Sequence, residues 1–153
     1  MKKLLSLTAF IFLSLSVVFT GCSKEESKTS TSSTEQKEFK YYTAEETKKA
    51  IAEKKDIILL DIQVEDEFKA HHINGVIPTY AYPVKSDEDK AKLEKVLPDF
   101  KKSTSSIIIV CPGGAGGAER TFAYLSEKGI DKDRLYILEK GQKGWTYEEL
   151  LEK

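Results

Sequence analysis

The sequence has little of the residues that mark several special classes of protein. Its 153 residues include two cysteines and four prolines, and the formal net charge is only −1. Two cysteines are too few for the disulfide framework of a small secreted domain. Without a basic excess, the chain has no charged surface for neutralising phosphates, which argues against a nucleic-acid partner. So few prolines and only nine glycines also exclude a collagen-like chain.

What the sequence does contain is enough apolar material for one folded core. The hydrophobic residues make up 40% of the chain, and the glycines bring the apolar share to about 46%, an ordinary value for a globular protein. Seven tyrosines and seven phenylalanines supply large side chains. We therefore expect a single compact domain and not a chain that is disordered throughout.

The N-terminus has the pattern of an export signal. Lys2 and Lys3 precede an apolar run over 4–19, which ends at Gly21 and Cys22. This ending resembles the lipobox of bacterial lipoproteins, in which the signal is cleaved before a cysteine that carries diacylglycerol. The alternative is an uncleaved membrane anchor, but the run is short against the roughly 20 residues that span a membrane. We expect residues 1–21 to be a signal peptide and Cys22 to be the lipidated (palmitate-bearing) first residue.

A polar segment separates this signal from the rest of the chain. Residues 23–34 are mostly Ser and Thr, with Lys and Glu and no aliphatic or aromatic side chain. Such a composition cannot bury a core. We expect 22–38 to be a tether on the extracytoplasmic side of a bacterial membrane, within the cell envelope, and 39–153 to be one domain.

The domain alternates strand and helix patterns. Strands are expected over 39–42, 57–62, 76–80, 107–110 and 135–138, and helices over 43–54, 65–71, 86–96 and 118–128, with a further helix beginning at 146. Thr43 to Glu46 and Thr146 to Glu149 both have the capping-box pattern that begins a helix. In the charged helix 86–96, Ala91 and Leu93 are expected to face inward. This alternation predicts an α/β fold with a parallel sheet between helices on both faces.

The chemically most distinctive residue is Cys111. It follows the β-branched run 107–110 and precedes a loop with four glycines and then a helix. Ligands in open α/β sheets bind beyond the carboxyl ends of strands. Successive N–H groups of a glycine loop, together with a helix N-terminus, favour an anion there, including a reactive thiolate. The competing interpretation is a buried, inert cysteine.

Two nucleotide-binding readings of this loop fail on spacing. In a dinucleotide site the third glycine of the motif would stand where Glu119 does, and a P-loop would end in a lysine that this loop lacks.

From Cys111 outward, the chain resembles the rhodanese family. The strand 58–63 is similar to the family's "LIDVR", 65–68 to its "EEY", and 72–76 to its "HIPGA". Cys111 stands where the family has its catalytic cysteine, and 136–145 is similar to the closing "YNLEGGxxxW". The resemblance covers nearly all of 39–153. It implies a rhodanese-like fold, with a five-stranded parallel sheet flanked by helices on both faces.

The resemblance also implies sulfur transfer. Cys111 would attack the outer sulfur of a small donor such as thiosulfate, a persulfide or a polysulfide, and pass that sulfur to a thiol acceptor. No metal or organic cofactor is needed for this cycle, and no protein partner is implied. The persulfide would be held by backbone N–H groups of 113–117. Arg120 could reach the mouth of the site, or it could be a surface residue beside Glu119. The implied substrate-binding residues are Pro112, Gly113, Gly114, Ala115, Gly116, Gly117 and Arg120.

Several positions depart from the family pattern. Gly116 stands where thiosulfate-active members commonly have an arginine, Gln63 replaces the arginine of "DVR", and His71 replaces the glycine before the family's histidine. The missing loop arginine keeps a second function open, namely a catalytically weak module that carries sulfur or binds a partner. A related cysteine phosphatase would need an arginine where Gly117 stands.

Three further residues are expected to be structural. By resemblance His72 is a structural hydrogen-bonding residue, and two adjacent histidines have a poor spacing for binding a metal. Asp61 is expected to accept hydrogen bonds from loop N–H groups. Trp145 is expected to pack on the sheet as a lid.

Overall fold

The computed structural model describes residues 39–153. The predicted signal peptide, the predicted lipidation residue Cys22 and the predicted tether lie outside the described residues. Within 39–153, no helix is both long and apolar enough to cross a membrane.

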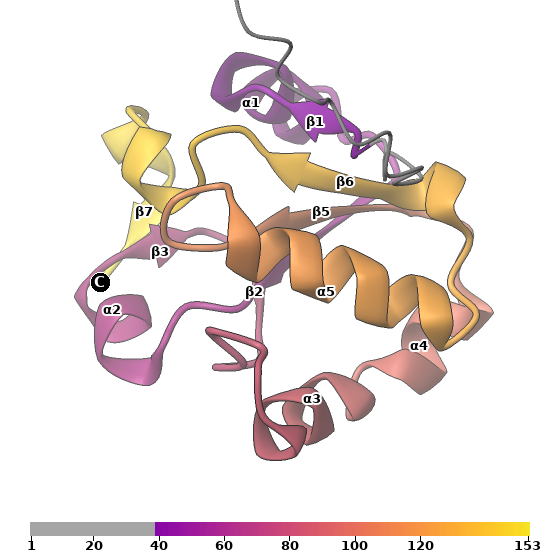
Figure 1. Ribbon diagram of the computed structural model, residues 1–153. Coiled ribbons are helices and arrows are strands. Elements are labelled where there is room, and N and C mark those ends of the chain that lie inside the picture. The colour runs from indigo at the N-terminus through magenta and orange to yellow at the C-terminus, as the bar shows by residue number, and fades with distance from the viewer. Residues whose placement is uncertain (1–38) are drawn as a thin grey trace, which may run out of the picture. The chain divides into compact units, whose positions relative to one another are not determined.

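The domain is built on one parallel sheet (Figure 1). Its strands are β1 (Tyr41–Tyr42), β2 (Ile57–Asp61), β4 (Ile77–Pro78), β5 (Ser106–Val110) and β6 (Leu135–Leu138). Their order is β1-β6-β5-β2-β4, and every neighbouring pair is parallel. This confirms the predicted α/β fold with a five-stranded parallel sheet.

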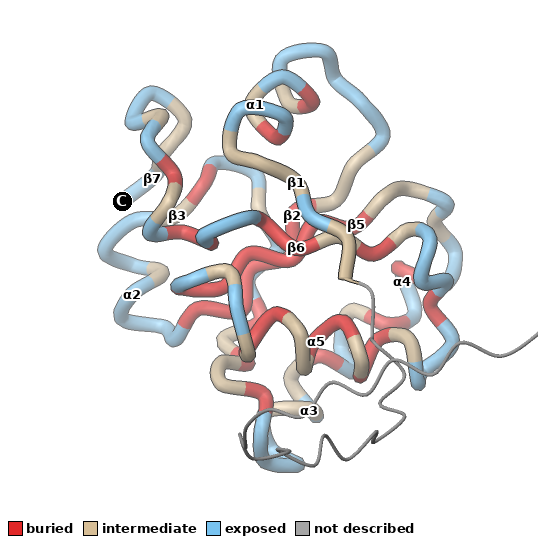
Figure 2. The backbone as a smooth tube through the Cα atoms, turned by 45° about the horizontal axis from the view of Figure 1, so that its top comes forward, coloured by how far each residue is buried: buried red, intermediate tan, exposed pale blue. Residues whose placement is uncertain are grey.

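The central strand β5 is covered on both faces, which is why its sequence is a continuous apolar run. Because side chains alternate along a strand, Ile107 and Ile109 enter one hydrophobic cluster, and Ile108 and Val110 enter the other. All four are fully buried. In Figure 2 the buried residues gather in the central strands and along the inner side of the long helix α5 (Gly116–Glu127).

Different helices cover the two faces. α3 (Asp87–Glu94), α4 (Leu97–Lys102) and α5 pack on the face that contains Ile107. α1 (Ala44–Ala52) and the C-terminal segment pack on the opposite face. The short α2 (Glu65–Ala70) follows β2 and has no buried residue.

The helices differ from the sequence expectation in three places. The charged helix expected over 86–96 forms as α3, which ends at Glu94, and it is followed by α4, a helix that the sequence did not predict. Within α3, Ala91 is exposed whereas Leu93 is buried. The inward placement of Ala91 was therefore wrong. α5 begins at Gly116, two residues earlier than expected, so the glycine loop is shorter and the helix end lies nearer to Cys111.

The expected helix from Thr146 does not form. In its place stand a 3-10 helix, η3 (Glu148–Leu150), and a strand, β7 (Leu151–Glu152), which pairs antiparallel with β3 (His72–Ile73). The physical reason is tertiary pairing: the Asn74 N–H donates to the Leu150 carbonyl at 2.8 Å, which extends this pairing. Glu149 binds Lys48 at 2.6 Å, whereas a capping box would have it reach back to Thr146.

Candidate active site

Cys111 lies where β5 ends, at the carboxyl edge of the sheet. Its side chain is buried, with 1% exposed, and its Sγ accepts a hydrogen bond from the Gly114 N–H at 3.0 Å. Of the N–H groups of 113–117 that the sequence suggested for this role, the Gly114 N–H is the one that contacts the sulfur among the described residues. A donated N–H stabilises negative charge on this atom, which is the condition for a nucleophilic thiolate.

Two glycines allow the loop to adopt this path. Gly114 and Gly141 both have positive φ, +69° and +55°. A Cβ on Gly114 would lie 2.5 Å from the Lys140 nitrogen, and a Cβ on Gly141 would collide with the Cys111 carbonyl oxygen. The cysteine loop thus rests directly on the loop that follows β6, and side chains at either glycine would separate them.

The positive end of α5 faces the same loop. Its N-cap residue, Ala115, offers no side-chain hydrogen bond to the first turn. The first N–H groups of a helix have no partner within the helix, so they are suited to bind an anion near Cys111.

Arg120 leans back toward the helix start, over Gly116. A guanidinium nitrogen lies 3.0 Å from where a Cβ of Gly116 would stand, and Nε donates to the Pro83 carbonyl at 2.9 Å. Gly116 itself does not have positive φ, so its lack of a side chain is not a backbone requirement. At Gly117 the lack of a side chain is required by packing, because a Cβ there would lie 2.8 Å from the Tyr82 ring.

Asp61 ends β2 opposite Val110, the residue before the cysteine. Its carboxylate is buried and accepts hydrogen bonds from the Gln63 backbone N–H at 2.7 Å and side-chain Nε2 at 3.0 Å. Burial raises the pKa of Asp61 to about 6, although these hydrogen bonds oppose the rise. The predicted loop N–H donor is thus the Gln63 backbone, and the Gln63 side chain is a partner that the sequence did not indicate.

The histidine and tryptophan side chains have structural contacts. His72 Nδ1 lies 2.9 Å from the Phe68 carbonyl oxygen, and its ring stacks on the Phe68 ring at 3.8 Å. Trp145 is buried in the cluster on the α1 face and donates from Nε1 to the Tyr147 carbonyl. Among residues 39–153, no three His, Cys, Asp or Glu side chains come together in a group that could hold a metal ion.

One buried polar residue near the cysteine was missed altogether. Gln142 follows Gly141, its backbone N–H donates to the Cys111 carbonyl at 2.8 Å, and its side chain is buried with 3% exposed. The only signal in the sequence was a glutamine within the segment similar to the closing family motif, which does not by itself indicate burial.

The domain is therefore an α/β domain with a cysteine at the end of a central parallel strand. A glycine-rich loop and a helix N-terminus follow this cysteine. The model of the rhodanese-like domain matches residues 43–148, and the chain belongs to that family. No protein with a curated description matches the sequence.

Solved structures agree on the fold. A rhodanese-like domain protein from Staphylococcus aureus is 25% identical, with a TM-score of 0.53 over 71% of this chain and 92% of that one. An As-Sb reductase from Leishmania major is 16% identical, with a TM-score of 0.58 over 74% and 85% of the two chains. A thiosulfate sulfurtransferase from Pseudomonas aeruginosa is 23% identical, with a TM-score of 0.54 over 74% of this chain but only 20% of that one.

Proposed function

We propose that this protein is a sulfurtransferase that carries sulfane sulfur as a persulfide on Cys111. The observation that supports this proposal is the hydrogen bond from the Gly114 N–H to the Cys111 sulfur. This sulfur lies near the start of α5, whose first turn has no side-chain cap. The thiosulfate sulfurtransferase among the similar structures is consistent with this chemistry.

The reaction has two displacements. The Cys111 thiolate attacks the outer sulfur of the donor, a new S–S bond forms, and the donor's own bond to that sulfur breaks. The leaving group departs with the electron pair: it is sulfite from thiosulfate, a thiolate from a persulfide, or a shorter polysulfide from a polysulfide. An acceptor thiolate then attacks the outer sulfur of the Cys111 persulfide, which releases the cysteine thiolate and leaves the sulfur on the acceptor.

The loop favours a persulfide or polysulfide donor over thiosulfate. Thiosulfate is a small dianion, and the loop offers it backbone N–H groups without an arginine at Gly116. The nearest guanidinium, that of Arg120, is anchored by the Pro83 carbonyl. The terminal sulfur of a persulfide or polysulfide needs less charge compensation at the site than the sulfonate end of thiosulfate does.

A second candidate is a sulfur carrier without rapid turnover. The sulfur of Cys111 is almost fully covered, and the loop lacks the arginine that would attract an anionic donor. Such a module would still form the persulfide, but would release it slowly.

The test is the intact mass of the purified protein after exposure, in turn, to thiosulfate, glutathione persulfide and inorganic polysulfide. We expect a gain of one sulfur atom, strongest with the persulfide and polysulfide, and located on the peptide that contains Cys111. Cys111→Ser should gain none, whereas the matched control Cys22→Ser should gain as much as the wild type. Absence of added sulfur with every donor would contradict the proposal, and slow release to thiols would favour the carrier.

A further inference from the structure

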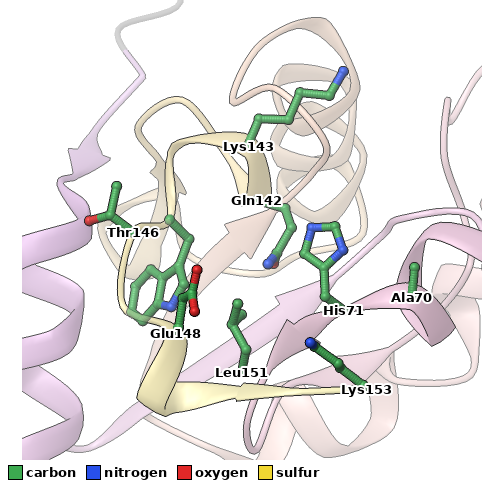
Figure 3. Close-up of a pocket in the computed structure, with 9 residues that line it drawn as sticks. Ala70, His71, Gln142, Lys143, Thr146, Glu148, Leu151 and Lys153 are labelled. Atoms are coloured by element: carbon green, nitrogen blue, oxygen red, sulfur yellow. The ribbon is translucent and has the colours of Figure 1, made fainter.

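The pocket drawn in Figure 3 lies between the end of α2, the loop after β6 and the C-terminal strand β7, and its volume is about 770 Å³. The side chains of Lys143 and Thr146 belong to its lining but point away from its space. The Gln142 amide atoms have no hydrogen-bond partner within 39–153, but they are fully covered and closed to a ligand. The other polar side chains of the lining are of mixed charge, so this pocket selects no class of ligand.

A second, smaller groove has a lining with an excess of positive charge. It lies between α5, α3 and the residues just before α3, and its volume is about 320 Å³. This volume is at the lower end of the range for small-molecule sites. The cations of the lining are Lys85, Lys90 and Arg120. Its acid is Glu127, so positive charge exceeds negative charge by two in a concave place, which favours an anion.

Arg120 is held in this groove by one of its three nitrogens. Its Nε donates to the Pro83 carbonyl at 2.9 Å, and its two terminal nitrogens have no hydrogen-bond partner within residues 39–153. Nη1 lies 3.0 Å from where a Cβ of Gly116 would stand, so the glycine leaves room for the guanidinium. A guanidinium fixed in this way presents its remaining N–H groups in the planar arrangement that binds oxyanions.

The two lysines add charge that the protein itself does not neutralise. Lys85 forms no ion pair among the described residues. Lys90 lies 3.4 Å from Asp87, but this carboxylate is 98% exposed, so the pair is weak. Lys128 on the same helix as Arg120 is different, because it binds Glu94 at 2.9 Å. The unmatched charge is therefore concentrated at the end of α5 that begins beside the cysteine loop.

The backbone that brings Lys85 to this groove is strained. Val84 has a φ of +60°, a left-handed conformation that β-branched residues rarely adopt. Val84 is buried and its N–H donates to the Ala81 carbonyl at 2.8 Å, whereas the Lys85 N–H donates to the Asp89 carboxylate at 3.0 Å. These contacts hold the strained residue in place. Such strain is concentrated at functional sites, and here it places the Pro83 carbonyl and Lys85 beside one groove.

We propose that this groove binds a phosphate group through the Arg120 guanidinium and the ammonium groups of Lys85 and Lys90. A phosphate carries up to two negative charges near neutral pH, which matches the excess of two positive charges better than a carboxylate does. The phosphate group can belong to a free compound or to a lipid headgroup, and the chemistry of recognition is the same. The site does not depend on sulfur transfer, because none of its contacts requires Cys111.

The first test titrates inorganic phosphate into the purified protein and follows its backbone amide NMR signals. We expect saturable shifts at the residues of the groove. Arg120→Gln should raise the Kd about tenfold, and Lys85→Gln about threefold because that side chain is exposed. Lys101→Gln removes the same charge from α4, outside the lining, and should leave the Kd unchanged. No saturable binding, or equal effects of Lys85→Gln and Lys101→Gln, would overturn the site.

A substitution of the opposite sign makes the test sharper. Glu127→Gln removes the carboxylate of the lining and should lower the Kd about threefold. Glu119→Gln removes the same charge from the same helix outside the lining, and should have no effect. Equal gains in the two variants would show that only the net charge of the protein matters, which would contradict a localised site.

Arg120→Gln also loses the hydrogen bond to the Pro83 carbonyl, so its melting temperature is measured beside its Kd. If that variant does not fold, Lys85→Gln and Glu127→Gln still decide the proposal, because both side chains are exposed. Glycerophosphoglycerol, the headgroup of phosphatidylglycerol, is the second probe. Binding at least as tight as that of inorganic phosphate would identify a lipid headgroup as the ligand, and binding of inorganic phosphate alone would identify a free phosphate compound. Binding of neither probe would overturn the proposal.

Discussion

At the scale of single residues, Asp61 shows what it costs to end a buried strand with a carboxylate. Its side chain is 1% exposed, and within residues 39–153 its hydrogen-bond donors are the two nitrogens of Gln63. Burial disfavours the charged carboxylate more than these hydrogen bonds favour it. The pKa of Asp61 therefore rises from 3.8 to about 6. The position therefore makes the stability of the fold depend on pH.

Replacement of Asp61 by Asn should remove this dependence. Between pH 4 and 6 the native wild type binds more protons at Asp61 than the unfolded chain does, so its free energy of unfolding falls as pH rises. The loss is nearly complete by about pH 7 and amounts to at most about 3 kcal/mol. Asparagine does not titrate, so Asp61→Asn should gain stability over the wild type as pH rises from 4 to 7. Urea unfolding at a series of pH values measures this, and a difference that is constant with pH contradicts it.

The same scale shows what sequence could and could not predict about the site. Cys111 was predictable because a β-branched run, a cysteine and four glycines are adjacent in the chain. The buried Gln63 amide and the unpaired Gln142 amide were not, since their burial comes from loops that approach one another only in the fold. Nor could sequence reveal that Gly116 has ordinary φ whereas Gly114 and Gly141 do not.

At the scale of elements, two identical capping patterns have different outcomes. The Thr43 Oγ1 accepts the Glu46 N–H at 3.1 Å, and the Glu46 carboxylate accepts the Thr43 N–H at 2.8 Å, so α1 begins as predicted. The pattern at Thr146 precedes a strand, because pairing with β3 and burial beside Trp145 outweigh a local helix signal. Most of the other helices and strands were predictable from the periodicity of apolar residues, because the helices pack on one five-stranded sheet.

These two threonines form a matched pair of substitutions. Thr43→Ala should lower the free energy of unfolding by about 1 kcal/mol, the usual loss when an N-cap is removed. Thr146→Ala should change it by less than about 0.5 kcal/mol, since its side chain is exposed and caps no helix. Chemical denaturation of both variants gives the comparison. Equal losses would mean that the second box forms in solution.

At the scale of the whole molecule, the chain combines a rhodanese-like domain with an N-terminal segment of quite different composition. The family match begins at residue 43, whereas the export pattern and its cysteine precede residue 23. The two cysteines would then serve separate purposes, with Cys111 carrying sulfur and Cys22 carrying lipid. Attachment of the domain to a membrane surface would restrict it to donors and acceptors of the cell envelope.

We expect lipidation and signal cleavage to depend on Cys22 and not on Cys111. A diacylglycerol thioether and a fatty amide on Cys22 would anchor the protein firmly, because two chains bind a bilayer far more strongly than one. Cys22→Ser should leave the precursor unlipidated and uncleaved before residue 22, whereas Cys111→Ser should be processed like the wild type. Mass spectrometry of the N-terminal peptide from bacterial membranes measures both acyl mass and cleavage position. An N-terminus elsewhere, or one at Cys22 without acyl groups, would show that the cysteine after Gly21 is not a lipidation site.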